Sequence, residues 1–134
     1  MKTPEQLNKS CENKLPCHLG ICVTHVSKTE LICEMEVKEY HMAPNGYLHA
    51  GSIVTLADSS CGYGCFANLP DGASGFTTIE LKSNFLGSAM EGTIECTAKP
   101  SHLGRTTQVW DAVVTHRESG KKIALFRCTQ MILY

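Results

Sequence analysis

The chain has 134 residues, of which 43% are hydrophobic and 19% are charged, and these values are typical of one globular domain. Its formal net charge of −1 gives no electrostatic reason to expect nucleic acid or an anionic membrane as a partner. No stretch approaches the roughly 20 apolar residues of a membrane span, and the first residues lack the apolar core of a secretory signal. We therefore expect a cytoplasmic protein with a single domain over residues 1–134, in which residues 1–16 form an N-terminal extension or a short helix.

The first third of the chain indicates a short helix followed by two strands. Residues 4–13 are polar but begin with helix-start residues, and the run Pro16-Cys17-His18 is expected to end the helix. Residues 18–26 and 30–38 have strand patterns, with a hairpin-length link at residues 27–29. In the second strand apolar and polar residues alternate, which is typical of a half-buried strand.

The central stretch, residues 45–66, predicts the only long helix. It follows the turn residues Pro44-Asn45-Gly46, and apolar or small residues then recur with helical spacing from Ile53 to Gly64. The pattern predicts a mostly apolar helix of roughly four turns. A mainly β chain with one such helix is expected to wrap its sheet around that helix.

The remainder of the chain predicts four strands. They lie at residues 76–86, 93–100, 105–116 and 121–133, with turns or loops at 69–72, 87–92, 101–104 and 118–120. Strict alternation in the first of these strands places Thr78 on the same face as Lys82, opposite to Thr77. The last strand is apolar on both faces and should lie inside the sheet. The order predicts an α+β fold with an antiparallel sheet packed on one helix.

Asp58 lies in the middle of the predicted apolar helix. A carboxylate is costly to remove from water without partners, so its position between Leu56 and Cys61 needs a reason. Asp58 lies either on an exposed flank of the helix or in a cleft, where it would act as a general base or a nucleophile.

Two sequence motifs resemble those of a known family. Asn45-Gly46-x-x-His49-x-Gly51 followed by Asp58, and the strand sequence over residues 75–86, resemble the hotdog-fold acyl-CoA thioesterases, in particular the phenylacetyl-CoA-thioesterase-like (PaaI-type) branch that uses an aspartate. The resemblance covers about residues 18–133 and implies a hotdog fold, thioester hydrolysis and acyl-CoA as the substrate. The chain departs from the family at Ala50, where glycine is usual, and at Ala43, where members often have asparagine, with Asn45 two residues later.

The spacing of His49 and Asp58 indicates a composite site. Nine positions on one straight helix correspond to about 2.5 turns and about 13.5 Å of rise, so the two side chains would point to opposite sides. A dimer could bring His49 of one copy to Asp58 of the other, and hotdog thioesterases are known for sites at subunit interfaces. We expect a homodimer with two composite sites, assembled further into a homotetramer.

Thioester hydrolysis assigns roles to the residues of these motifs. Asp58 would attack the carbonyl carbon or activate a water molecule, and the N–H groups of Ala50 and Gly51 at the helix start would hold the oxyanion. His49 would donate to the same oxygen or fix the turn. The resemblance implies that Thr78 orients the attacking water and leaves open whether Asn45 takes the role of the family asparagine.

Coenzyme A carries phosphates, so basic residues should line the entrance of the site. The resemblance places nucleotide contacts near the predicted loop at residues 101–104, which makes Arg105, Gly104 and His102 candidates, and Lys82 is a further one. Coenzyme A would bind as part of the substrate, and we expect no metal or redox cofactor.

The chain has eight cysteines, and none forms the C-x-x-C pairs of a zinc or redox site. Without an export signal we expect reduced thiols rather than metal ligands or disulfides.

Two other functions fit the same fold. A hotdog hydratase or dehydratase would need a different His and Asp spacing, and the departures at Ala43 and Ala50 would suit a module that binds acyl-CoA without hydrolysing it. Acyl groups of both aryl and medium-chain aliphatic type would suit a pocket lined by Tyr47, Tyr63 and Phe66.

Overall fold

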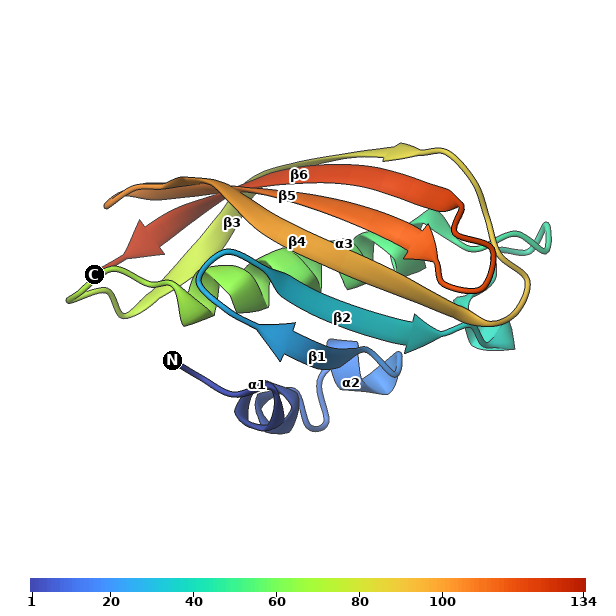
Figure 1. Cartoon of the computed structure of the whole chain (residues 1–134), viewed down its shortest axis with the longest axis horizontal. Helices are drawn as coiled ribbons and strands as arrows, with labels where there is room; N and C mark the ends of the chain where they lie inside the picture. Colours follow the sequence, from blue (N-terminus) through green and yellow to red (C-terminus); the bar gives the residue numbers. More distant parts are fainter.

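One long helix lies within a strongly curved antiparallel sheet in the computed structural model, which describes residues 1–134 (Figure 1). The helices are α1 (Pro4–Ser10), α2 (Leu15–His18) and α3 (Ala50–Ala67), and Glu39–His41 form a single 3-10 turn. The strands are β1 (Cys22–Val26), β2 (Leu31–Glu36), β3 (Gly75–Phe85), β4 (Thr93–Leu103), β5 (Thr107–His116) and β6 (Lys122–Leu133). The predicted order of two strands, one long helix and four strands is confirmed.

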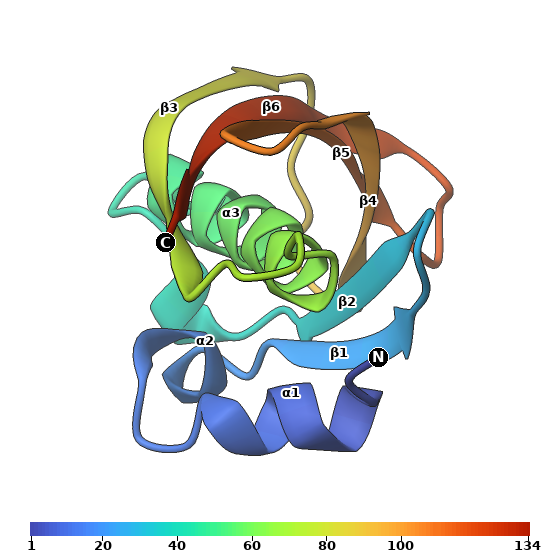
Figure 2. The same ribbon diagram turned by 90° about the vertical axis from the view of Figure 1, so that its left-hand side faces the viewer.

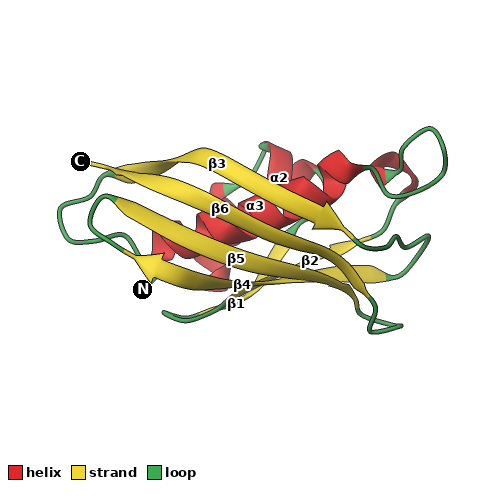
Figure 3. Cartoon of the chain, turned by 90° about the horizontal axis from the view of Figure 1, so that it is seen from above, coloured by secondary structure: helices red, strands yellow, loops and turns green.

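The sheet has the strand order β1-β2-β4-β5-β6-β3, and every neighbouring pair is antiparallel. Seen along α3, the sheet curls around the helix and leaves an open side between its two edge strands, β1 and β3 (Figure 2). From above, the long strands β3 to β6 cross over α3 (Figure 3). β6 lies between β5 and β3, as its apolar sequence predicts. This is the α+β hotdog architecture expected from the sequence.

The ends of α3 are capped by side chains, and one face of the helix is buried. His49 is the N-cap, with its ring Nδ1 accepting from the Gly51 N–H at 2.7 Å, and Asn68 Nδ2 donates to the Gly64 carbonyl at 2.9 Å. The buried residues are Ser52, Ile53, Leu56, Ala57, Ser60, Cys61, Gly64 and Cys65. Small residues let the sheet approach closely, since a Cβ at Gly64 would lie 2.6 Å from the Trp110 ring. No helix of the chain combines the length and hydrophobicity that a membrane span requires.

Three predicted boundaries were wrong. β4 continues through Leu103 with a register shift between Pro100 and His102, so residues 101–103 belong to a strand and not to a loop. Pairing with β5 outweighs the turn-like local sequence there. Pro16 does not break a helix but lies in the first turn of α2, where its missing N–H has no cost, and β1 starts only at Cys22.

The predicted face of Thr78 was also wrong. A register shift between Thr78 and Glu80 marks a bulge in β3. Because a bulge adds one residue to one strand, the alternation of faces changes phase there. Thr78 pairs with the buried Gln130, whereas Lys82 pairs with the exposed Arg127. Thr78 therefore faces α3, and Lys82 faces outward.

The expectation that all cysteines are reduced was wrong for one pair. Cys11 and Cys17 form a disulfide across the loop between α1 and α2, with their Cα atoms 5.5 Å apart. That separation lies within the range that a disulfide requires, which the sequence spacing alone does not show. Five of the six free cysteines are buried, as expected for small apolar side chains, and Cys22 is exposed.

Candidate active site

A pocket of about 380 Å³ lies on the open side of α3. One side of α3 forms its base, β3 contributes a second wall, and the segment that carries α1 and α2 contributes a third. The lining residues are Asp58, Ser59, Gly62, Tyr63 and Phe66 of α3, Phe76 and Thr78 of β3, and Ser10 and Pro16 of the N-terminal segment. The pocket surface is mostly apolar, with Asp58, Ser59 and Thr78 among its polar lining residues, which is the usual composition of a small-molecule site.

Asp58 is half-buried and lines this pocket. Its Oδ1 atom is buried and has no hydrogen-bond partner within the chain. Burial raises the pKa of the Asp58 carboxyl group above its ordinary value, because the charged form loses its hydration. Of the two alternatives for Asp58, the cleft is the one that the structure shows. No group of three or more His, Cys, Asp or Glu side chains is arranged to hold a metal ion.

The Thr78 hydroxyl is held in place by a buried amide. Its Oγ1 donates to Gln130 Oε1 at 2.6 Å, and Gln130 on β6 has no exposed surface. With its proton engaged, the Thr78 oxygen can accept a hydrogen bond from a water molecule in the pocket. Gln130 was not predicted from the sequence, although a polar residue at an inward position of a strand is a recognisable signal.

The start of α3 presents two hydrogen-bond donors. The Gly51 N–H already donates to His49 Nδ1, so it is not free to hold an oxyanion. Glycine at 51 leaves room for this contact, since a Cβ there would lie 2.9 Å from His49 Nδ1. Because Nδ1 accepts, the neutral imidazole carries its proton on Nε2. The free donors are therefore His49 Nε2–H and the Ala50 N–H, for which the chain offers no acceptor.

His41, a buried histidine that was not predicted from the sequence, holds the loop before α3. The His41 ring is fully buried, its Nδ1 accepts from the Lys38 N–H at 3.0 Å, and its Nε2 donates to the Leu19 carbonyl at 2.8 Å. The His41 carbonyl in turn accepts from the His49 N–H at 3.0 Å and from the Ser52 hydroxyl at 2.9 Å. His41 thus ties the start of α3 to the N-terminal part of the chain.

Asn45 lies in the turn before α3 and not in the pocket. Its side-chain oxygen accepts from the Tyr47 N–H at 3.1 Å, an Asx turn that shapes the loop. Next to this turn, a second hollow of about 470 Å³ lies beside the start of α3. It is lined by Tyr47, Leu48, Ala50, Ile53, Phe85, Gly87 and Ser88. Tyr63 and Phe66, two of the aromatic residues predicted for the pocket, lie with Asp58, whereas Tyr47 lies in the second hollow.

Within one chain the two halves of the candidate site stay apart. His49 precedes the first residue of α3 and Asp58 lies nine positions further on, about 13.5 Å along the axis. Asp58 and Thr78 share one pocket, and Ala50 lines the other. The residues predicted for one reaction are thus divided between two hollows of the same protomer.

The residues predicted to contact coenzyme A do not line the Asp58 pocket. Gly104 and the exposed Arg105 are in the turn between β4 and β5, where the Tyr134 hydroxyl donates to the Arg105 carbonyl at 2.6 Å. His102 belongs to β4 beside this turn. Lys82 lies on the outer face of the sheet, in a hollow that it shares with Asp111 and Arg127.

Comparison with known proteins links this geometry to a family. The model of the family described as "Thioesterase superfamily" matches residues 45–123, a range that contains His49, Asp58 and Thr78. A protein named 1,4-dihydroxy-2-naphthoyl-CoA hydrolase, from Listeria monocytogenes, is 33% identical over 111 residues, which cover 83% of this chain and 89% of that protein.

Solved structures agree with this family match. A mutant thioesterase from Pseudomonas aeruginosa superposes with a TM-score of 0.93 at 30% identity, covering 99% of this chain and 95% of the other. The PaaI protein from the phenylacetic acid degradation operon of Escherichia coli has a TM-score of 0.82, with coverage of 98% and 94%. Its identity of 23% makes it evidence for the shared fold alone.

Proposed function

The chain belongs to the thioesterase superfamily and is a thioester hydrolase, and from this premise we propose that it cleaves acyl-CoA esters with aryl or medium-chain acyl groups into the free acid and coenzyme A. One observation supports the assignment of the reacting group. Asp58 holds a buried carboxylate oxygen without a partner, in a pocket that is also lined by Tyr63, Phe66 and Phe76. The aryl acyl group in the name of the Listeria relative suits such a lining.

In the proposed reaction, Asp58 acts on the thioester carbonyl carbon either through a water molecule or directly. As a base, it takes a proton from a water held by the Thr78 oxygen, and the hydroxide adds to the carbonyl carbon. As a nucleophile, its oxygen adds to the same carbon, and water later hydrolyses the anhydride. In both versions the carbon–sulfur bond breaks and coenzyme A leaves as a thiolate.

The oxyanion formed by this addition needs donors that are fixed in advance. His49 Nε2–H and the Ala50 N–H have no acceptor within the chain and lie at the start of α3, where the helix dipole adds a partial positive charge. The proposed oxyanion hole thus differs from the one predicted from the sequence, in which the N–H groups of Ala50 and Gly51 were the two donors. A small side chain at Ala50 would allow the thioester to approach closely.

Since Asp58 and His49 lie apart within one chain, we propose that a second copy completes each site. β3 is an edge strand with a free side, and exposed apolar side chains lie along it at Ile79, Leu81 and Phe85. A two-fold axis near β3 would bring the hollow at Ala50 of one protomer toward the Asp58 pocket of its partner. The assembly we propose is a homodimer with two such sites, paired further into a homotetramer.

The nucleotide part of coenzyme A would lie outside the pocket. Arg105, with Gly104 and His102 beside it, supplies a cation at the β4–β5 turn, and Lys82 supplies another on the outer face of the sheet. A cytoplasmic location, which would give the enzyme access to acyl-CoA, belongs to the same proposal, although a disulfide such as Cys11–Cys17 is uncommon in that compartment.

The test is hydrolysis of a panel of acyl-CoA esters together with mixing of two inactive variants. His49→Ala and Asp58→Asn should each be nearly inactive. Dimers reassembled from an equal mixture should recover about a quarter of wild-type activity, since half of the dimers are mixed and each mixed dimer holds one intact site. Unfolding and reassembling each variant alone is the control.

Three outcomes would contradict the proposal. No recovery on mixing would mean that both residues act within one protomer. Hydration of an enoyl-CoA without release of coenzyme A would favour the hydratase. Tight acyl-CoA binding without turnover in the wild-type protein would favour a binding module.

A further inference from the structure

The N-terminal segment contributes one wall of the Asp58 pocket. Ser10 at the end of α1 and Pro16 in the first turn of α2 line it, opposite the residues of β3. In the view along α3, α2 lies beside β1 at the lower edge of the open side of the sheet (Figure 2). This wall lies outside residues 45–123, the part of the chain that matches the family model.

α1 is fixed to the sheet by the Asn8 side chain, which forms two hydrogen bonds to the backbone of one residue of β1, as a neighbouring strand would. Asn8 Oδ1 accepts from the Val23 N–H at 2.7 Å, and Asn8 Nδ2 donates to the Val23 carbonyl at 3.0 Å. Leu7, the preceding residue, has no exposed surface and belongs to the core. α1 is therefore a fixed support and not a loose extension.

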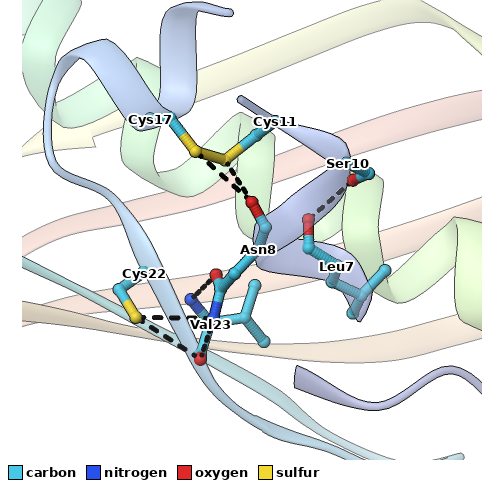
Figure 4. The surroundings of a disulfide bond; sticks show 7 residues. All are labelled: Leu7, Asn8, Ser10, Cys11, Cys17, Cys22 and Val23. Atoms are coloured by element: carbon cyan, nitrogen blue, oxygen red, sulfur yellow. Dashed lines mark hydrogen bonds between the residues drawn. A yellow bond between two sulfur atoms is a disulfide. The ribbon is translucent and has the colours of Figure 1, made fainter. Parts of the chain in front are cut away.

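The disulfide joins the two residues that follow the pocket-lining positions. Ser10 precedes Cys11 and Pro16 precedes Cys17, so the bond fixes the two lining residues relative to each other. Both sulfur atoms also lie against the Asn8 carbonyl oxygen, at 3.1 Å for Cys11 and 3.5 Å for Cys17 (Figure 4). The wall is thus connected to Asn8, whose side chain holds β1.

We propose that Ser10 and Pro16 are specificity-determining residues that limit the size of the acyl group, and that the Cys11–Cys17 bond holds them at the pocket. This inference rests on the proposed function, since it concerns the acyl pocket of the same site. On α3, Asp58 and Phe66 are eight positions apart, about 12 Å of rise. An acyl group that extends from Asp58 toward Phe66 would lie next to Ser10 and Pro16.

The effect of the wall on acyl size is tested by placing a larger side chain at position 10. Ser10 is exposed and its hydroxyl bonds only to the Leu7 carbonyl, so Ser10→Trp changes the pocket without opening the core. For large aryl and long-chain acyl-CoA esters, relative to butyryl-CoA, kcat/KM should fall by at least about tenfold, a typical cost of steric exclusion from an apolar pocket. Ser10→Leu is a milder second variant, with an intermediate effect expected. An equal fall for all esters, or no fall, would overturn the proposal.

The role of the disulfide is tested by removing it in two ways. A dithiol reductant passes two electrons and two protons to Cys11 and Cys17 and becomes a cyclic disulfide itself. Reduction and the double variant Cys11→Ser, Cys17→Ser should give the same change, at least a threefold rise in the ratio of kcat/KM for large to small esters. Cys22→Ser is the matched control, since this exposed cysteine does not line the pocket and a serine oxygen can still accept from Asn8 Nδ2, as the Cys22 sulfur does at 3.5 Å. Its profile should equal that of the wild type. An unchanged profile after reduction and in the double variant would refute the role of the bond.

Binding separates this inference from the proposed function. Dissociation constants of the same esters, measured by calorimetry with Asp58→Asn protein, report on the wall without turnover. Failure of the wild type to hydrolyse any ester would contradict the proposed function. If adding Ser10→Trp to this protein weakens the binding of large esters more than that of small ones, the role of the wall is supported independently of hydrolysis. An equal effect on the binding of all esters would overturn that role.

Discussion

Replacing Asp58 by asparagine should abolish activity and at the same time stabilise the protein. The change keeps the size of the side chain and removes its charge. If Asp58 is the reacting carboxylate, kcat/KM should fall by at least about 100-fold, equivalent to about 2.7 kcal/mol of transition-state stabilisation. The stability gain follows from the buried Oδ1 atom, which has no partner.

The size of the stability gain can be estimated from burial. An unsatisfied buried polar group costs about 1–3 kcal/mol, and more if it is charged. Asp58 is only half-buried, so solvent screens part of that cost. The asparagine amide is also a polar group without a partner, so the variant still bears part of the remaining cost. We expect Asp58→Asn to gain about 1 kcal/mol, which raises Tm by about 3–5 °C for a chain of this length.

The difference in stability between the wild type and Asp58→Asn should depend on pH. The pKa of Asp58 is raised in the folded state, so its ionisation favours unfolding. The stability of the wild type relative to the asparagine variant should therefore be greatest below the unfolded pKa of about 3.9 and decrease as the pH rises through the folded pKa. The acid limb of kcat/KM in the wild type should likewise lie above the ordinary range of an aspartate.

The assay is urea unfolding of both proteins across pH at one fixed concentration, since oligomers gain stability with concentration. Hydrolysis is followed on the same samples. A variant that is less stable than the wild type at neutral pH would contradict the cost assigned to the unpaired Asp58 oxygen, and one that retains near-normal turnover would exclude Asp58 as the reacting group.

Two further predictions concern groups that the structure holds in close contact. Gly64→Ala should cost about 1–3 kcal/mol in urea unfolding, because its Cβ would lie 2.6 Å from the Trp110 ring, and an unchanged unfolding midpoint would contradict this packing. Thr78→Val should lower kcat by about tenfold or more and reduce stability by about 1–3 kcal/mol, because Gln130 Oε1 loses its donor. Thr77→Val, at an exposed position, should leave both quantities unchanged, and equal effects of the two valines would argue against the assigned faces.

Periodicity was sufficient to predict the parts of the fold that contribute most to the core. The spacing from Ile53 to Gly64 predicted α3, and the alternation in residues 30–38 predicted β2, because both elements bury one regular face. The apolar last strand was correctly placed inside the sheet. These are cases in which local pattern and tertiary packing favour the same structure.

The parts that the sequence did not predict depend on tertiary contacts. The bulge after Thr78 changes the face of a candidate residue, and nothing in the run of threonines marks the extra residue. His41 and Gln130 are buried polar residues whose partners lie far away in the sequence or on the next strand. The disulfide required the positions of two short helices that have no apolar periodicity.

The placement of the free cysteines has a consequence for chemical labelling of the protein. Five of the six are enclosed by the sheet and α3, and burial raises the pKa of Cys33, Cys65 and Cys96 to about 12, so they form little thiolate at neutral pH. Cys22 alone is exposed. A chromogenic disulfide reagent should therefore react with about one thiol in each native chain, and a single fluorophore attached at Cys22 would report on the contact between β1 and Asn8 of α1.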